Sequence, residues 1–228
     1  TANDLPGTDH GALSDNTTAG IARWRAYEDS VLQQLRAVDS RSLGTGADRV
    51  LHGVLLDQVE RDVGVRVCRL ELWGVASYVN GWQASLTDLA RVQPAGTDEL
   101  RALALQRARA IPRYIDNEVV LLQQGLRAGY SSPKVIVREV ISQLDSLLAV
   151  TPAQSPFSAP AQKDTTPAFQ SAYHAIVRDE INPAVRRYRT YLQERYLPAA
   201  REELGVAANP DGRACYDAVV RQFSTVPM

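Results

Sequence analysis

Histidine, cysteine and any excess of one charge are the features that this 228-residue sequence has least of. Its 25 Lys and Arg residues nearly balance 26 Asp and Glu residues, which leaves a formal net charge of -1. A nucleic-acid-binding protein normally carries a basic face or stripe, so we expect no nucleic-acid partner. No stretch approaches the roughly 18 consecutive apolar residues of a membrane helix, so we also expect no membrane span.

The shortage of histidine leaves little material for a metal site. His10, His52 and His174 are the three histidines, and none has another four residues away, so the H-E-x-x-H zinc motif is absent. The G-x-S-x-G elbow, the P-loop and the G-x-G-x-x-G turn are absent too. We therefore predict no catalytic residue, no metal ligand and no cofactor in this chain. A weaker alternative is an enzyme that uses His174 with Asp179 or Glu180, although helical spacing does not present both acids with the histidine.

The two cysteines, Cys68 and Cys215, are too few for a disulfide framework or a metal motif. Both flank apolar residues, which favours a buried free thiol at each position. The alternative is one bridge between them in an oxidising compartment. The chain starts at Thr1 rather than at methionine and continues with a polar stretch, so we expect an exported protein, periplasmic or secreted.

Apolar residues make up 45% of the chain, and they recur at the spacing of helices. We predict an all-α fold of roughly seven to nine helices, with long antiparallel pairs and no significant sheet. Residues 1–20 are expected to form a polar leader or linker, and residues 21–228 a single helical domain. The main apolar stripes cover residues 21–38, 50–59, 70–89, 97–126, 135–148, 169–197 and 214–223.

Local signals divide these helices. Thr97 is expected to cap the fourth helix, and Pro112 to kink or split it. Ser132 is expected to cap the next helix, and Pro183 to break or restart a later one. Residues 151–167 carry four prolines and are predicted to be the one long loop.

The segment ELWGVASYVNGWQASLTDLARVQP, residues 71–94, has the apolar spacing of a helix but contains Gly74, Asn80 and Gly81. Each of these three residues is costly inside a helix. One explanation is close packing within the same chain. The other is a surface shaped for a ligand or for another part of the protein, which Asn80 and Gln83 would face.

Aromatic and arginine side chains suggest a groove. Trp82 and Tyr188 have the polar tips that suit a groove wall, although plain core packing is the alternative. Arg186, Arg187 and Arg189 can grip a carboxylate, although a salt-bridged helix surface is the alternative.

Four stretches resemble one bacterial family. They are WGVASYVNGWQASLTDLARVQP, RARAIPRYIDNEVVLLQQGLRAGYSSPKVIVREVISQLDSLL, SPF and YLPAAREELGV…PDGRACYDAVVRQFST. The family is the one labelled domain of unknown function 885, a group of zinc-dependent hydrolases or peptidases by its motifs. The resemblance covers residues from about Val50 to Met228, and it places Tyr130 and Tyr216 among the recurrent positions of the family. The candidate cleft or interface residues are thus Asn80, Trp82, Gln83, Tyr130, Arg186, Arg187, Tyr188 and Tyr216.

The resemblance implies that this chain is the N-terminal helical half of a longer metallohydrolase that acts on peptides. In the family, an H-E-x-x-x-G-H segment lies beyond the position of Met228, so zinc is implied for a complete member and not for this chain. The implied partner is the C-terminal catalytic half of the same protein, and the chain by itself would be truncated and inactive. The alternative is a stand-alone helical binding module for a peptide or an anionic partner.

Overall fold

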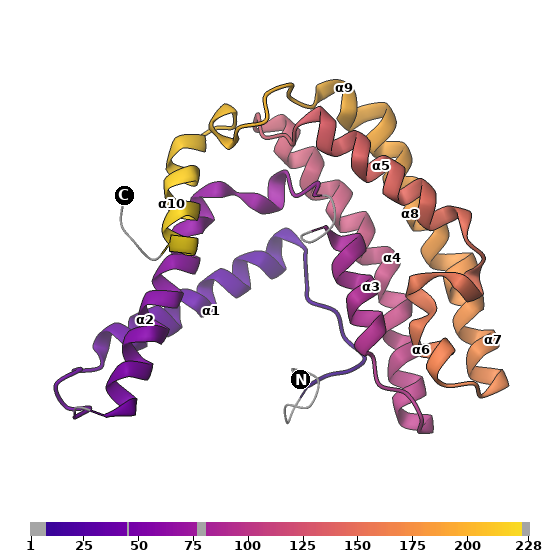
Figure 1. The fold of residues 1–228 in the computed structure, drawn as a ribbon, viewed down its shortest axis with the longest axis horizontal. Helices are drawn as coiled ribbons and strands as arrows, with labels where there is room; N and C mark the ends of the chain where they lie inside the picture. Colours follow the sequence, from indigo (N-terminus) through magenta and orange to yellow (C-terminus); the bar gives the residue numbers. More distant parts are fainter. Residues whose placement is uncertain (1–7, 45, 77–80, 225–228) are drawn as a thin grey trace. The chain divides into compact units, whose positions relative to one another are not determined.

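The computed structural model describes residues 8–44, 46–76 and 81–224 (Figure 1). The all-α prediction is confirmed: these residues form helices and no strand, apart from an isolated bridge between Pro133 and Arg201. The chain divides into two compact units. Unit 1 comprises Thr1–Asn16 and Leu72–Glu202, and unit 2 comprises Thr17–Glu71 and Glu203–Met228. The prediction of one helical domain over residues 21–228 stays a prediction.

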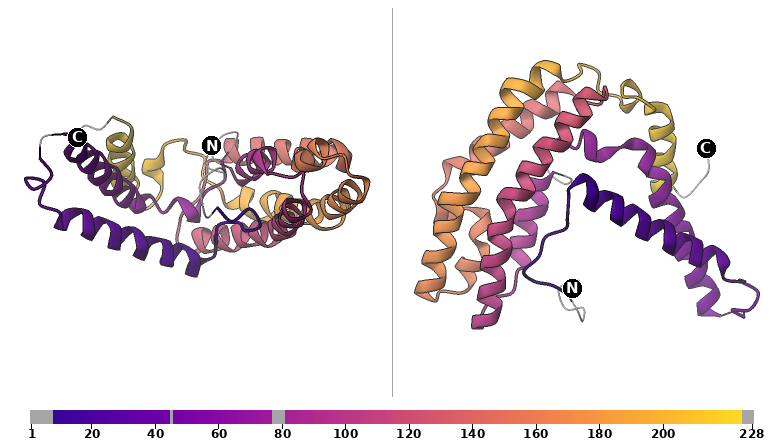
Figure 2. Two further views of the ribbon diagram at one scale, coloured as in Figure 1. Left: turned by 90° about the horizontal axis from the view of Figure 1, so that it is seen from below. Right: turned by 180° about the vertical axis from the view of Figure 1, so that it is seen from behind.

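Unit 1 is a layered helical bundle in which α8 packs against both α4 and α5 (Figures 1 and 2). Its core is continuous, and its largest fully buried side chains include Tyr188, Tyr196, Phe157, Ile115 and Leu122. The helices are α3 (Trp82–Val92), α4 (Asp98–Arg127), α5 (Lys134–Ala149), η4 (Pro152–Gln154), η5 (Pro156–Ser158), α6 (Ala159–Lys163), α7 (Pro167–Ile176), η6 (Val177–Ile181), α8 (Asn182–Tyr191), η7 (Leu192–Tyr196) and α9 (Leu197–Ala199).

Helix α4 confirms the predicted cap and excludes one of the two outcomes predicted for Pro112. Thr97 is its N-cap, and the Thr97 side chain accepts a hydrogen bond from the N–H of Leu100 at 3.2 Å. Pro112 does not split the helix, which runs unbroken from Asp98 to Arg127. One missing N–H is tolerated because Ala108 and Ile111, on either side of that turn, are buried in the core.

The run from α7 to α9 shows how a helix accommodates proline. Pro183 was expected to break or restart the helix, but the helical run continues through it. A π-helical turn, η6, directly precedes Asn182 and Pro183, and a second, η7, precedes Leu197 and Pro198. The wider π-turn gives space for the proline ring against the preceding carbonyls, so the chain keeps its direction.

Two loop predictions are wrong. Residues 151–167 are not an open loop, because they form η4, η5 and α6 and bury Phe157, Ser158 and Ala161 in the core. Ser132 does not cap α5, whose N-cap is Pro133. The Ser132 hydroxyl instead donates to the carbonyl of Trp73 at 2.6 Å. Tertiary partners outside the local sequence decided both cases.

The segment of residues 71–94 is only partly helical, so the prediction of one helix across it is wrong. Helix α3 begins at Trp82, and residues 74–76 lie outside any helix. Gly81 is the N-cap of α3, where a Cβ atom would lie 2.4 Å from the carbonyl oxygen of Ala76. This contact lies within the same chain and favours the close-packing explanation for Gly81. Asn80 lies outside the described residues.

Unit 2 contains α1 and α2 side by side in opposite directions, with α10 alongside α2 (Figures 1 and 2). The opposite directions follow from two contacts: His52 meets the carbonyl of Leu35, and Arg66 pairs with Asp29. The elements are α1 (Thr18–Ala37), α2 (Ala47–Val65), η2 (Arg66–Cys68), η3 (Leu70–Leu72, which ends in unit 1), η8 (Val206–Ala208) and α10 (Gly212–Ser224).

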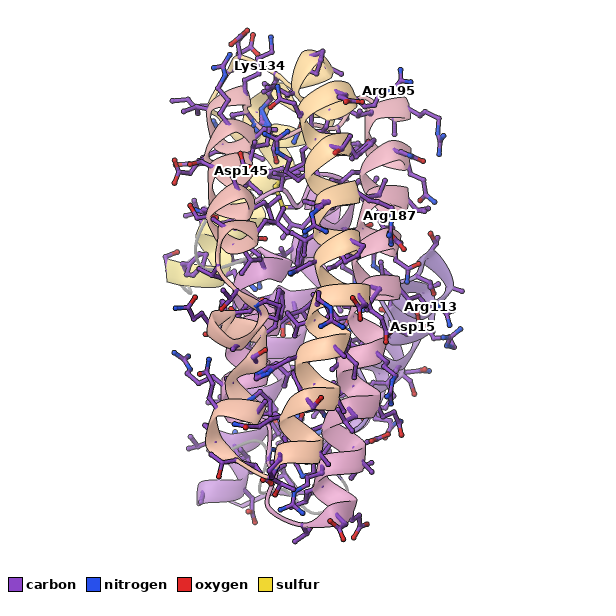
Figure 3. All side chains as sticks on the ribbon, turned by 90° about the vertical axis from the view of Figure 1, so that its right-hand side faces the viewer. Asp15, Arg113, Lys134, Asp145, Arg187 and Arg195 are labelled. Atoms are coloured by element: carbon purple, nitrogen blue, oxygen red, sulfur yellow. A yellow bond between two sulfur atoms is a disulfide. The ribbon has the colours of Figure 1, made fainter. Side chains whose placement is uncertain are left out.

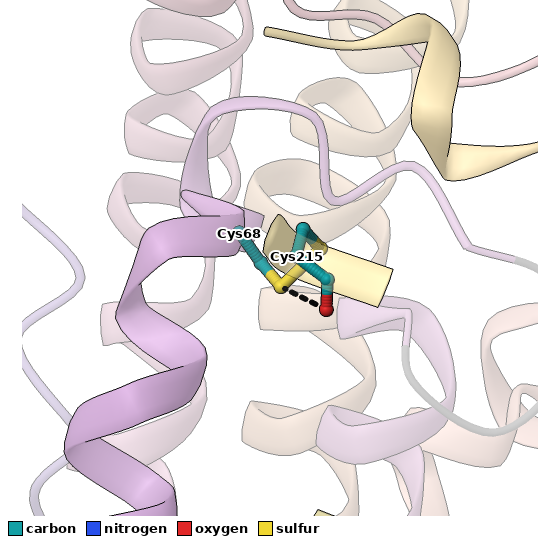
Figure 4. The surroundings of a disulfide bond; sticks show 2 residues. All are labelled: Cys68 and Cys215. Carbon is teal, nitrogen blue, oxygen red and sulfur yellow. Dashed lines mark hydrogen bonds between the residues drawn. A yellow bond between two sulfur atoms is a disulfide. The ribbon is translucent and has the colours of Figure 1, made fainter. Parts of the chain in front are cut away.

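Cys68 and Cys215 form a disulfide with their Cα atoms 4.6 Å apart, so the expectation of free thiols is wrong (Figure 4). Both residues are buried, as predicted. The alternative of one bridge is the one observed; the sequence does not favour it because the two positions are separated by 147 residues, and the packing of α10 against η2 brings them together.

No helix among the described residues is long and apolar enough to span a bilayer.

Candidate functional site

The polar segment of residues 8–16 is fixed onto α4 by one buried guanidinium. Arg107 donates hydrogen bonds to the backbone oxygens of Ala12 at 2.8 Å and of Asp9 at 2.5 Å, and a third to the side-chain oxygen of Gln93. Burial lowers the pKa of Arg107, while the charge of Asp9 acts in the opposite direction. A segment predicted as leader or linker is therefore tied to the helical bundle.

Asn16 attaches the same segment to α4 at positions further toward the C-terminal end of the helix than Arg107. Its amide nitrogen donates to the carbonyl of Tyr114 at 2.9 Å and to Oε1 of Glu118 at 2.8 Å. Its amide oxygen accepts from the side chain of Asn117 at 2.9 Å. With both ends of the amide engaged, Asn16 holds the Glu118 carboxylate in one orientation.

A polar hollow of about 220 Å³ lies where this segment meets α4. The α4 positions in its wall recur at three and four residues, so they share one face of the helix. Figure 3 labels Asp15 and Arg113, which belong to the two sides of the hollow. Its lining residues are Leu13, Ser14, Asp15, Asn16, Ala110, Arg113, Tyr114 and Asn117.

The titratable groups beside the hollow have shifted pKa values. Burial raises the pKa of Glu118, and the hydrogen bond from Asn16 opposes that shift. Burial also raises the pKa of Tyr114, the nearby charge of Glu118 adds to the effect, and a hydrogen bond with Ser14 opposes it.

Two of the residues predicted to line a groove lie in the core of unit 1. Trp82 is 5% exposed and Tyr188 is 1% exposed. Their rings pack edge to face with centroids 5.2 Å apart. Burial is the main cause that raises the pKa of Tyr188. This geometry favours the core-packing alternative for both side chains.

Gln83 and Tyr130 also make contacts within unit 1. The side-chain amide of Gln83 donates to the carbonyl of Ala76 at 2.8 Å and to Oε1 of Gln143 at 3.3 Å. Tyr130 is buried, and its N–H donates to the carbonyl of Gly125. A binding role for these residues stays a prediction.

The arginines of α8 lie on the surface, where Figure 3 shows Arg187 and Asp145. Arg187 pairs with Asp116 of α4 at 2.8 Å, and Arg189 pairs with Asp145 of α5 at 2.9 Å. The alternative of a salt-bridged helix surface is confirmed for this pair of arginines. Arg186 is exposed beside them, and its role in holding a carboxylate stays a prediction.

Tyr216 belongs to α10 of unit 2, whereas the other candidate residues described above belong to unit 1. It is 47% exposed, and the guanidinium of Arg213 lies 5.8 Å from its ring centroid.

The histidines do not gather into a metal site. Across the part of the chain that the structure describes, no group of three or more His, Cys, Asp or Glu residues is placed to hold a metal ion. His52 contacts the carbonyl of Leu35 at 2.9 Å. The sequence offers Asp179 as a possible catalytic partner of His174. In the structure, Asp179 forms an ion pair with Arg178 at 2.7 Å.

Sequence reasoning missed Asn16, Tyr114 and Glu118. The polar composition of residues 1–20 predicts a leader or linker, so it does not indicate Asn16 as part of a site. The α4 positions Tyr114 and Glu118 are four residues apart and share a face, which is a readable signal. This face of α4 contacts residues 8–16. No local sequence pattern indicates that the N-terminal segment packs there.

Comparison with known proteins gives one family. The family described as "Bacterial protein of unknown function (DUF885)" matches residues 2–228. No curated protein matches the chain.

Proposed function

The chain belongs to the DUF885 family of bacterial proteins, and we propose that it is the helical scaffold portion of a zinc-dependent hydrolase that acts on peptides. In this proposal the chain does not carry out the reaction by itself. It binds further polypeptide of the same protein, which supplies the catalytic residues. The hydrolase assignment rests on the motif resemblance described above.

The observation that carries the proposal is an uncovered apolar face on α2. Val50, Leu51, Val54 and Leu55 are 44% to 67% exposed, and we call these four residues the α2 stripe. No residue of α2 is buried. Contiguous apolar surface of this kind marks a site of interaction. An amphipathic helix is stable in water only when its apolar side is covered.

The position of the α2 stripe indicates what covers it. Val54 and Arg61 are seven residues apart in α2, so they lie on one side of that helix. Arg61 donates to the carbonyl of Gln222, and Cys68 is bonded to Cys215, so this is the side that contacts α10. The stripe lies nearer the N-terminal end of α2 than the contacts of Arg61 and Asp62 with α10. We therefore expect its occupant to be an amphipathic helix in line with α10, with apolar residues at helical spacing.

The zinc implied by the family resemblance does not fit the described residues, which contain no suitable set of ligands. We therefore place no step of a metal mechanism in this chain. In the proposal, the ligands come from the further polypeptide. The substrate class, peptides, is likewise assigned to the whole protein.

The disulfide supports export from the cytoplasm. Disulfides persist in oxidising compartments and are rare in cytosolic proteins. The pairing of Cys68 with Cys215 is therefore a reason to propose a periplasmic or secreted location.

The test measures zinc content and exposed apolar surface on the purified 228-residue chain. After exhaustive dialysis, we expect less than about a tenth of an equivalent of zinc. We also expect binding of a hydrophobic dye or self-association, both weakened by Val54→Ser and Leu55→Ser together. The matched control is Val135→Ser, because Val135 is 52% exposed on α5 and lies outside the stripe.

The alternative, a stand-alone binding module for a peptide or an anionic partner, predicts a monomer that does not bind the dye. That result would remove the main support for a scaffold. A full equivalent of zinc would contradict the assignment of the metal ligands to further polypeptide.

A further inference from the structure

The Cys68–Cys215 disulfide joins two parts of unit 2 that are far apart in the chain. Cys68 ends η2, directly after α2, and Cys215 lies in the first turn of α10. Between them in sequence lies all of unit 1 from Leu72 to Glu202. The bond therefore links the N-terminal and C-terminal segments from which unit 2 is assembled.

Helix α10 contacts α2, η2 and η8, but few of its residues are fully buried. Within α10, only Gly212 and Cys215 are buried. Tyr216 and Phe223 are 47% and 84% exposed. The polar contacts with α2 include a hydrogen bond from Arg61 to the carbonyl of Gln222 at 2.6 Å. Ala218, Val219 and Val220 are only partly buried, which limits the hydrophobic contribution to the attachment of α10.

Helix α10 is also too short to persist unaided. It has 13 residues, and isolated helices below about 12–15 residues are marginal in water. A covalent bond at Cys215 keeps the first turn of α10 beside η2 however weak the other contacts of the helix are. We infer that the disulfide is the main interaction that holds α10 against α2 and η2.

We propose that the Cys68–Cys215 disulfide is a redox-sensitive clasp, and that its reduction releases and unfolds α10 while unit 1 stays folded. The release uncovers the side of α2 that contacts α10, where Arg61 and Asp62 form hydrogen bonds with Gln222. The clasp itself follows from the geometry of unit 2 and does not rest on the proposed function.

The reductant is a dithiol. One of its thiolates attacks a cysteine sulfur, the protein S–S bond breaks, and the other cysteine leaves as a thiolate. The second thiol of the reductant then displaces the first cysteine from the mixed disulfide and closes a cyclic disulfide. Two electrons pass to the protein, and both cysteines take up a proton. Because Cys68 and Cys215 are each 2% exposed, the attack requires a local opening of unit 2 around the bond.

The test is hydrogen exchange measured by mass spectrometry on the full chain, with and without dithiothreitol. After reduction, confirmed by thiol counting, we expect amides of α10 to exchange at least about tenfold faster. Amides in the middle of α4 serve as the internal control and should be unchanged. The variant with both Cys68→Ala and Cys215→Ala should exchange like the reduced chain, and dithiothreitol should not alter it further.

Three results would overturn the proposal. The first is unchanged exchange of α10 in the fully reduced chain. The second is loss of protection in α4 together with α10, which would make the bond a support of the whole chain. The third is two free thiols in protein purified without reductant. The scaffold proposal is tested by zinc content and dye binding, whereas this proposal is tested by hydrogen exchange. Either proposal can therefore fail without the other.

Discussion

At the scale of single residues, two helical glycines differ in the space that surrounds them. Gly125 is buried in α4, and a Cβ atom there would lie 1.8 Å from the carbonyl oxygen of Leu72. Gly53 lies in α2, and a Cβ atom there would meet nothing within 4 Å. Only the first glycine is required by close packing.

Gly125→Ala should therefore lower the free energy of unfolding by about 3 kcal/mol, because the added methyl group displaces a backbone carbonyl in a packed core. Gly53→Ala is the matched control and should raise the free energy of unfolding by about 0.5–1 kcal/mol, through helix propensity. Urea denaturation measures both. Equal effects of the two substitutions would contradict the close contact between Gly125 and Leu72.

Glu118 predicts a pH dependence of stability. Its pKa is raised above the ordinary 4.5 in the folded chain, so the folded state binds the proton more tightly than the unfolded state does. Protonation of Glu118 therefore contributes stability that is fully present below about pH 4.5 and is lost as the pH rises through the folded pKa.

Glu118→Gln keeps an acceptor for Asn16 and removes the charge. We expect the free energy of unfolding of the variant, relative to the unsubstituted chain, to increase between about pH 4 and about pH 8. Denaturation at a series of pH values measures this difference. A difference that stays constant over the range would show that the Glu118 carboxyl group has an ordinary pKa.

At the scale of elements, the N-terminal segment acts as part of unit 1. Its attachment depends on Arg107, which contacts Asp9, Ala12 and Gln93, and on Asn16, which contacts Glu118. Removing a buried donor leaves its acceptors without a partner, which costs more than the net value of the hydrogen bonds themselves.

Arg107→Met should free residues 9–13 and lower the free energy of unfolding by about 1–3 kcal/mol. Limited proteolysis of this segment and urea denaturation measure the two effects. The control is Arg109→Met, since Arg109 is exposed on the same helix. If both variants are cleaved at the same rate in residues 9–13, Arg107 does not hold the segment.

At the scale of the whole molecule, the two units differ in how much core they possess. Among the buried apolar residues, those of unit 2 are Leu32, Cys68 and Cys215, and the others belong to unit 1. Since burial of apolar surface is the main favourable contribution to folding, unit 1 is expected to be the more stable of the two.

We therefore expect two unfolding transitions in urea when hydrogen exchange is followed separately in α1 and in α4. The α1 transition should occur at the lower urea concentration. Coincident transitions would contradict this expectation and would support the single helical domain predicted over residues 21–228.

The sequence by itself determined the fold class, because apolar residues at helical spacing define helices wherever they pack. It also determined local boundaries such as the Thr97 cap, since a capping side chain acts on the next turn of its own chain. The alternative of a salt-bridged α8 surface was readable too, because Glu180 and Glu194 flank its arginines in the sequence, although the observed partners are Asp116 and Asp145 of other helices.

Tertiary structure alone decided the features that join distant residues. The Cys68–Cys215 bond, the contact of Gly125 with Leu72 and the network of Asn16 with Glu118 all connect separate parts of the chain. The spacing of apolar residues along the sequence carries no information on such pairs, because their proximity depends on how the helices pack against one another. The position of Trp82 in the core has the same origin: its polar indole suited a groove, and contact with Tyr188 made it a core residue.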